Sequence, residues 1–222
     1  MAILDTSSLV KTLDHINHKF LLGETIPAGE ALEASRWIAS RQGAKGSYRG
    51  LSAPTPLDFE QGIRLFTGEK LVCASARHIM GQEASRAVWL LGRQDALVRK
   101  AYEQATRWMH EEAYFHETGL YCCGRCSLSF WRHFSVGDFK NKEALLSKGI
   151  KKMQAYRLGD GKWRRYPFFY AIYTLADLDL DPARSELMYA RPVIERYLKK
   201  SHTDPIGQRK AMILEKALAK IN

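Results

Sequence analysis

Three of the four cysteines lie within five consecutive residues, close enough to hold a metal ion or to provide a reactive thiol. Cys123 and Cys126 form a C-x-x-C at the predicted N-terminus of a helix, and Cys122 directly precedes it. The helix dipole and the neighbouring Arg125 favour the thiolate form of a cysteine at this position. A structural zinc ion needs four ligands, so Cys122, His116 or His133 would have to complete the site, and His133 lies on the same helical face as Cys126. Zinc binding, a redox or nucleophilic thiol, and a tight turn of small buried side chains are three open interpretations.

Polar side chains follow one stripe of the otherwise apolar segment 74–91. His78 and Gln82 are four residues apart, which places them on the same face of a helix. His78 could act as a general base with Glu83 as its partner, and a second Arg-His pair ends at His133. We therefore name His78, Glu83 and His133 as candidate catalytic residues. The alternative is a hydrogen-bond network in the core, because buried polar groups need partners.

A set of mainly basic residues is expected to gather at one end of the fold as the rim of a ligand site. The set consists of Arg77, Arg125, Arg132, Arg164, Arg165 and Tyr166. Guanidinium groups bind phosphates and carboxylates through paired hydrogen bonds, so the set predicts a ligand with an anionic end, such as a diphosphate. Exposed basic residues on successive turns, without a ligand, are the alternative.

The chain of 222 residues carries 34 lysines and arginines against 24 acidic residues, a net charge of +10. This excess would attract phosphates, nucleic acid or an anionic membrane surface. It is divided into short clusters, none of which reaches the five or six like charges of a nucleic-acid tail. The longest apolar stretches are too short to cross a bilayer, and no signal peptide is recognisable, so we expect a cytoplasmic protein without a membrane span.

Helical periodicity dominates the chain, and strand signals are nearly absent. Amphipathic helices are predicted around 32–38, 101–109 and 145–153, and more buried helices at 74–91, 128–136 and 167–178. Two further helices are predicted at 186–198 and 205–221, the second with Thr203 or Asp204 as its N-cap. A short helix is expected around 58–67, after a loop at 43–57 that is rich in glycine and proline.

A glycine, a spacer and an aromatic residue recur three times in the sequence. These triplets are Gly46-Ser47-Tyr48, Gly119-Leu120-Tyr121 and Gly161-Lys162-Trp163. The pattern predicts a repeated hairpin, in which a glycine turn reverses the chain, the aromatic side chain packs at the turn, and an inner helix returns. We therefore expect one domain, residues 1–222, with repeat units at about 30–92, 97–137 and 143–180 and C-terminal helices at 186–221.

The run Lys148-Gly149-Ile150, Gln154 and Gly161-Lys162-Trp163 resembles the Q-x-G-x-W repeat of terpenoid cyclases and the hairpins of protein prenyltransferase beta subunits. The resemblance covers residues 30–180, although the D-x-D-D acid motif and the prenyltransferase zinc ligands are absent. It implies an all-α fold of helical hairpins in a partial α/α toroid, completed by a homodimer or by the terminal helices. It also implies that an apolar, isoprenoid-like ligand with an anionic end is bound or transformed. The alternatives are a nucleic-acid-binding helical repeat and a zinc-holding scaffold.

Overall fold

The computed structural model describes residues 2–72 and 75–222. Within these ranges the chain forms eleven α-helices and no strand, which confirms the all-α prediction. None of the described helices combines the length and the apolar character that a membrane span requires. The chain divides into two compact units. Unit 1 comprises Met1–Phe66, Lys70–Glu112 and Val136–Asp138, and unit 2 comprises Thr67–Glu69, Ala113–Ser135 and Phe139–Asn222.

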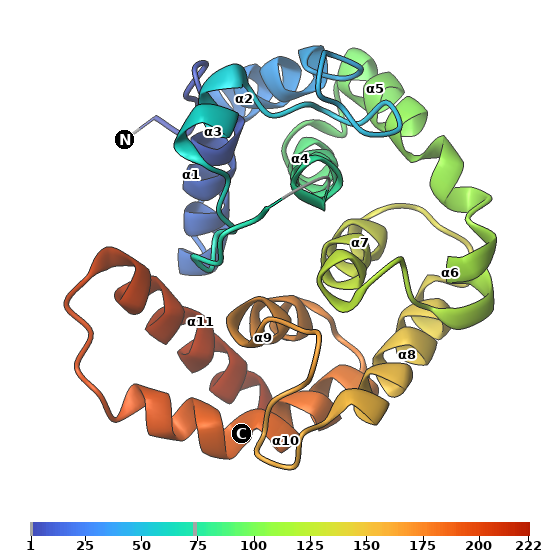
Figure 1. Ribbon diagram of the computed structural model, residues 1–222. Coiled ribbons are helices and arrows are strands. Elements are labelled where there is room, and N and C mark those ends of the chain that lie inside the picture. Colours follow the sequence, from blue (N-terminus) through green and yellow to red (C-terminus); the bar gives the residue numbers. More distant parts are fainter. Residues whose placement is uncertain (1, 73–74) are drawn as a thin grey trace. The chain divides into compact units, whose positions relative to one another are not determined.

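Unit 1 is built around one buried helix. Its helices are α1 (Leu9–Leu22), α2 (Ala28–Ser40), α3 (Pro56–Gln61), α4 (Ser75–Gly92) and α5 (Ala96–Thr106), followed by a 3₁₀ turn at Arg107–His110. Helix α4 packs against α1, α2 and α5, which surround it within the unit (Figure 1). Most of its side chains are buried, as expected for a helix without a wide polar face. The candidate catalytic residues His78 and Glu83 therefore lie on the most enclosed helix of unit 1.

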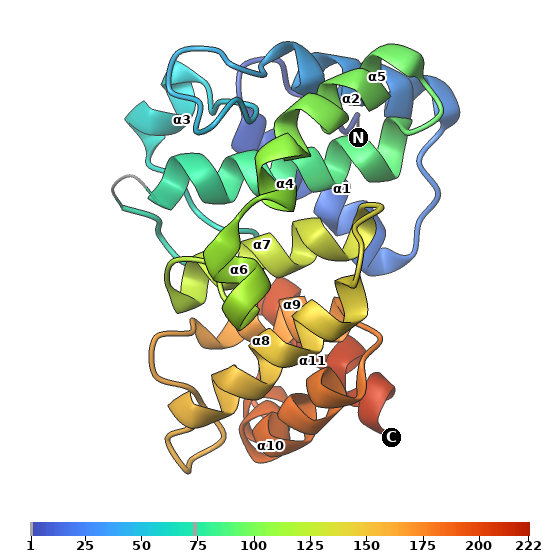
Figure 2. The same cartoon turned by 90° about the vertical axis from the view of Figure 1, so that its right-hand side faces the viewer.

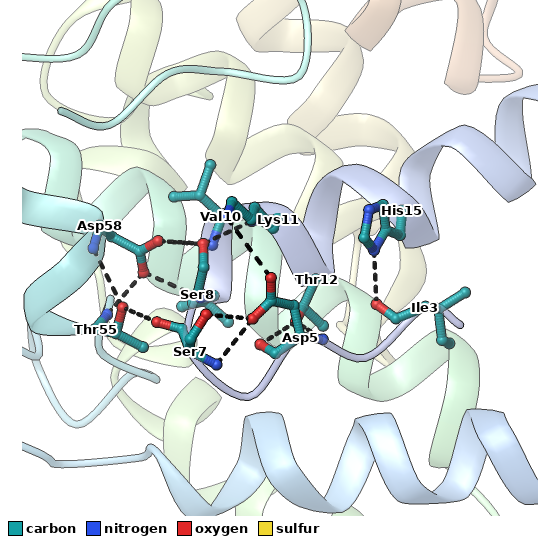
Figure 3. A network of polar contacts seen from close by, with 11 residues as sticks. Ile3, Asp5, Ser7, Ser8, Val10, Lys11, Thr12, His15, Thr55 and Asp58 are labelled. Carbon is teal, nitrogen blue, oxygen red and sulfur yellow. Dashed lines mark hydrogen bonds and ion pairs between the residues drawn. The ribbon is translucent and has the colours of Figure 1, made fainter. Parts of the chain in front are cut away.

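The buried carboxylate of Asp58 joins the start of α1 to the start of α3 (Figure 3). It accepts hydrogen bonds from the Ser8 hydroxyl at 2.5 Å and from the backbone N–H of Leu9 at 3.0 Å. It also accepts the N–H of Thr55, whose hydroxyl accepts the N–H of Asp58 in return, forming a capping box on α3. A single acidic side chain thus satisfies N-terminal donors of two helices.

Unit 2 contains the remaining six helices. They are α6 (Ala113–Thr118), α7 (Gly124–Val136), α8 (Lys142–Met153), α9 (Phe168–Asp177), α10 (Asp181–Leu198) and α11 (Pro205–Ile221). Helix α9 lies alongside α10 and α11, and α8 packs against α6 and α10 (Figure 2). Helix α9 is also held at its C-terminus, because the Lys220 ammonium of α11 donates to the carbonyls of Ala176 and Leu178. The apolar helix at 167–178 is thus enclosed by the C-terminal helices.

The predicted helices are confirmed, with corrected boundaries. Helix α7 begins four residues earlier than the predicted segment 128–136, so it follows directly on Cys123. The short helix expected around 58–67 is instead α3, Pro56–Gln61, because Gly62 takes a positive φ of 79° that ends it. Asp204 is the N-cap of α11, as one of the two predicted residues.

The three recurring glycines all adopt the left-handed backbone that the hairpin pattern predicts. Gly46, Gly119 and Gly161 have φ values of 94°, 71° and 87°. Of the aromatic residues two positions later, Tyr121 and Trp163 are buried, and Trp163 donates to the buried carboxylate of Glu186 at 2.7 Å. Each of the three glycines therefore has the backbone conformation that the predicted turns require.

Candidate thiol site

The N-terminus of α7 brings three thiols together in unit 2. The sulfur atoms of Cys122, Cys123 and Cys126 all lie within 4.8 Å of one another. The Cys123 and Cys126 sulfurs are 3.1 Å apart and share a hydrogen bond. Cys122 and Cys123 are exposed, whereas Cys126 is only 1% exposed. The fourth cysteine, Cys73, lies outside the described residues. The site thus pairs an accessible thiol with a buried one on the first turn of a helix.

The loop that carries these thiols is held in a conformation that an ordinary residue rarely adopts. Cys122 has a φ of 55°, in the left-handed region, which costs a non-glycine residue about 1 kcal/mol or more. The Ser127 hydroxyl holds the preceding residue, because it accepts the Tyr121 N–H at 2.9 Å and donates to the Tyr121 carbonyl at 2.8 Å. These contacts fix the path of the backbone into Cys122 and Cys123.

Close contacts between backbones position both ends of the same loop. The Gly119 carbonyl accepts the indole N–H of Trp131 at 2.7 Å, and a Cβ added at Gly119 would lie 2.3 Å from the backbone nitrogen of Gly149 in α8. A Cβ added at Gly124 would lie 2.5 Å from the carbonyl oxygen of Arg165. Neither position has room for a side chain, so the loop is packed tightly against α8 and against the segment before α9.

The surroundings of the two C-x-x-C cysteines favour a thiolate at Cys123 and a protonated thiol at Cys126. The pKa of Cys123 is lowered to about 5, mainly by its hydrogen bond with Cys126, aided by the backbone N–H groups of Cys126 and Arg125 and by the Arg125 charge. The pKa of Cys126 is raised, first by the same hydrogen bond and then by burial. The helix start and Arg125, which were expected to favour a thiolate, thus both contribute to the lowered pKa of Cys123.

Aromatic and basic groups border the thiols. Tyr166 is buried, and its pKa is raised by burial and by its neighbours Tyr156 and Cys123. Arg165, which also has a left-handed backbone with a φ of 72°, places its guanidinium 5.6 Å from the Tyr156 ring. Arg125 is half-buried and Arg164 is exposed. Four members of the predicted ligand rim, Arg125, Arg164, Arg165 and Tyr166, thus occur in segments that meet at the N-terminus of α7.

Arg132 and His133 are placed differently, in the interior of α7. The Arg132 side chain is 0% exposed, donates to Asp177 of α9 at 2.5 Å, and lies 3.9 Å from the centre of the Tyr173 ring. His133 is likewise fully buried and does not belong to the group of ligand atoms formed by the three cysteines. Of the four predicted metal ligands, the structure therefore groups the three cysteines alone.

The remaining predicted site residues belong to unit 1. His78 is 7% exposed, its ring contacts the edge of Tyr48 at 5.1 Å between centroids, and burial lowers its pKa. Glu83 is buried on the same helix, whereas Arg77 is exposed and lies 5.7 Å from the Phe59 ring. The predicted catalytic set is thus divided, with His78 and Glu83 in unit 1 and His133 in unit 2.

Two residues that position the thiol site were not identified from the sequence. Ser127 directly follows the C-x-x-C, and Gly149 lies within the repeat motif at Lys148-Gly149-Ile150. The only sign of their role in the sequence is that each lies in or next to one of the two motifs.

Comparison of the chain with protein-family models, curated proteins and solved structures finds no match in any of the three.

Proposed function

We propose that the protein carries out thiol–disulfide exchange, with Cys123 as the attacking thiolate and Cys126 as the resolving thiol. The observation that carries this proposal is the 3.1 Å contact between the two sulfurs on the first turn of α7, with Cys123 exposed and Cys126 buried. An exposed sulfur can reach a disulfide in solution, and a buried sulfur beside it can attack only the intermediate. The low pKa of Cys123 adds a thiolate at neutral pH.

The reaction divides into two balanced exchanges. The Cys123 thiolate attacks one sulfur of a substrate disulfide, forms a mixed disulfide with it, and releases the other substrate sulfur as a thiolate. Cys126 then loses its proton to solvent and attacks the Cys123 sulfur, which releases the second substrate thiolate and leaves a Cys123–Cys126 disulfide. The substrate disulfide gains two electrons and the protein dithiol loses two. A dithiol reductant returns the protein to its starting state.

Single-turnover mass spectrometry tests this function. Reduced protein is mixed with a small disulfide, quenched with acid and mapped by peptide. We expect the Cys123–Cys126 peptide of the native protein to lose the mass of two hydrogen atoms, and Cys126→Ser to accumulate the mixed disulfide on Cys123. Cys123→Ser should form neither product, and Cys122→Ser, the matched control, should react as the native protein does. Equal reaction of Cys123→Ser and the native protein would contradict the proposal.

A metal-binding function is the second candidate, and it is favoured by the three sulfur atoms within 4.8 Å. Three thiolates suit a soft or borderline ion such as zinc, with the fourth position left to water or a substrate group. Cadmium titration separates the two functions, because thiolate binding gives an ultraviolet charge-transfer band. A metal site predicts that Cys122→Ser weakens cadmium binding, whereas thiol–disulfide exchange predicts that the same variant keeps its reactivity. Zinc co-purifying with the native protein would favour the metal.

Separately, we propose that the helices form a partial α/α toroid that binds an isoprenoid-like ligand with an anionic end. It is supported by the positive φ at Gly46, Gly119 and Gly161 and by the apolar helices that follow them. Its candidate residues are divided between unit 1, with Arg77, and unit 2, with Arg164 and Arg165. Native mass spectrometry of protein purified without chelator tests it, since a retained apolar ligand would support it and release of bare protein would count against it.

A further inference from the structure

We infer, on the basis of the proposed exchange reaction, that the substrate disulfide carries negative charge next to its sulfur–sulfur bond, and that Arg125 and Arg165 select it. These two arginines share a lack of acidic partners, because neither forms an ion pair within the part of the chain that the structure describes. They provide positive charge that the fold itself leaves uncompensated.

Three other arginines of unit 2 have a structural role, because each forms an ion pair with a carboxylate of the same unit. Arg132 pairs with Asp177, Arg157 with Glu186 and Arg191 with Glu195, at 2.5, 2.7 and 2.7 Å. These guanidinium groups have their charges balanced by carboxylates inside unit 2. Arg125 and Arg165 have no such carboxylate among the described residues, so their charges are available to an anion from solution.

The positions of these arginines follow from the packing of the thiol loop. The Arg165 carbonyl meets Gly124, which begins α7 directly after Cys123. Both Cys123 and Arg165 act electrostatically on the same phenol, Tyr166, the first raising its pKa and the second lowering it. Arg125 acts directly on Cys123 and lowers its pKa. Two arginines from segments far apart in the sequence therefore share the surroundings of one thiolate.

The charge of unit 2 as a whole acts in the same direction. Nearly all of the net charge of +10 falls within unit 2, and unit 1 is close to neutral. A field of this sign raises the local concentration of anions and speeds their encounter with the site, and salt screens it. It also stabilises the thiolate that leaves when the substrate bond breaks. The encounter step is the one that favours a negatively charged disulfide over a neutral or positive one.

The test compares two small disulfides of opposite charge, 3,3′-dithiodipropionate with two carboxylates and cystamine with two ammonium groups. Rates of mixed-disulfide formation on Cys123 are measured with the Cys126→Ser variant and divided by the rates of a neutral model thiol. At low ionic strength we expect the normalised rate to be about tenfold or more higher for the dicarboxylate, which corresponds to about 1.4 kcal/mol. We expect 0.5 M salt to remove most of the difference.

Charge variants test the role of the arginines, and a neutral reagent tests the exchange reaction separately. Arg125→Gln combined with Arg165→Gln should reduce the preference severalfold, and Arg196→Gln, on the exposed surface of α10, should leave it unchanged. Equal normalised rates for the two disulfides, or a preference that survives the double substitution, would overturn the inference. Iodoacetamide is uncharged and reports on the thiolate alone. If Cys123 of the native protein reacts with it no faster than the model thiol at pH 6, the exchange reaction itself is wrong.

Discussion

Cys123 and Cys126 have the same side chain and differ only in their surroundings. Cys123 is exposed and receives hydrogen bonds from the first turn of α7, whereas Cys126 is buried and its pKa is raised. The surroundings of His78 act in a similar way, because burial lowers the pKa of its ring and so favours the neutral form. At this scale the environment of a residue, more than its type, determines its protonation state.

We expect alkylation of Cys123 to stay fast in mildly acidic solution. Its pKa of about 5 means that the thiolate persists from pH 8 down to pH 6 and falls to about half near pH 5. An ordinary thiol with a pKa near 8.5 would lose about tenfold in rate for each pH unit over that range. Iodoacetamide labelling with peptide mapping measures the profile, and Cys126→Ser should shift it to higher pH because the main hydrogen bond is removed. A tenfold loss per unit at Cys123 would contradict the assignment.

We expect His78 to make unit 1 less stable as the pH falls. Its folded pKa is lowered, so above the unfolded value near 6.5 both states are neutral and nothing is lost. Below 6.5 the unfolded chain binds a proton that the buried ring resists, and stability is lost as the pH falls toward the folded pKa. Urea unfolding at pH 7.5 and 5.5 should therefore show a smaller pH effect for His78→Gln than for the native protein. An identical effect in both would show that His78 is not responsible.

At the scale of elements, helix ends in this protein are completed by groups from other parts of the chain. Asp58 serves the N-termini of α1 and α3, and Lys220 of α11 serves the C-terminus of α9. Side chains of this kind replace hydrogen bonds that a helix cannot make for itself. The consequence is that helix stability depends on residues outside the helix.

Replacing Lys220 with methionine tests this dependence at α9. The variant leaves the carbonyls of Ala176 and Leu178 without their ammonium donor, which we expect to cost about 1–2 kcal/mol in the free energy of unfolding. Lys216→Met is the matched control on the same helix, because Lys216 is 41% exposed and forms an ion pair with Asp177 that should contribute less than about 1 kcal/mol. Urea denaturation measures both, and equal losses would contradict the capping role.

The contact between α8 and the thiol loop gives a second prediction for elements. In Gly149→Ala, the new Cβ would lie 2.0 Å from the Gly119 carbonyl oxygen, so the loop or α8 must move. We expect a loss of about 1–3 kcal/mol in unfolding free energy, together with slower labelling of Cys123. Gly29→Ala is the control, since nothing lies within 4 Å of its added Cβ and alanine favours a helix. Unchanged labelling in Gly149→Ala would show that α8 does not position the thiols.

At the scale of the whole molecule, the two units differ in charge. Unit 2 carries nearly all of the positive excess and also holds the thiol site, whereas unit 1 holds the most enclosed helix, α4. A charge difference of this size directs any anionic partner toward unit 2. The total of +10 alone does not indicate where an anionic partner would bind, because it does not show that the positive charge is divided unevenly between the units.

Binding to nucleic acid checks this division. We expect a DNA duplex of about 20 base pairs to bind weakly, without sequence preference, and to lose roughly tenfold or more in affinity between 50 and 200 mM salt. Lys151→Gln with Lys152→Gln, in unit 2, should weaken binding, and Arg99→Gln with Lys100→Gln, in unit 1, should not. Fluorescence anisotropy measures all three proteins. Tight binding whose affinity falls steeply with salt would instead favour the nucleic-acid function that the sequence left open.

Periodicity was sufficient to predict most of the helices, because an amphipathic or wholly apolar pattern at 3.6 residues reports directly on burial. Helix α6 was not predicted, since six residues give too short a pattern. Helix α1 was not located either, although Ser8 caps its start and Gly23 ends it in the left-handed conformation, which are recognisable signals.

The thiol cluster could be predicted because its three cysteines are neighbours in sequence. The surroundings could not, because Arg165 reaches Gly124 only through folding, and no local pattern records that contact. For the same reason the sequence did not distinguish Arg132, which is paired with Asp177, from Arg125, which has no acidic partner among the described residues. Local motifs identify reactive groups, and long-range packing determines which charges remain available to a ligand.

The shared cap at Asp58 has a consequence for protein synthesis. The N–H of Leu9 receives its carboxylate acceptor from a residue 49 positions later in the chain. At a translation rate of about 5–20 residues per second, the start of α1 leaves the ribosome several seconds before Asp58 is synthesised. A helix of 14 residues is marginal on its own in water, so α1 has only the local cap of Ser8 in the nascent chain until then. Its apolar residues are then open to chaperones until the α3 segment emerges.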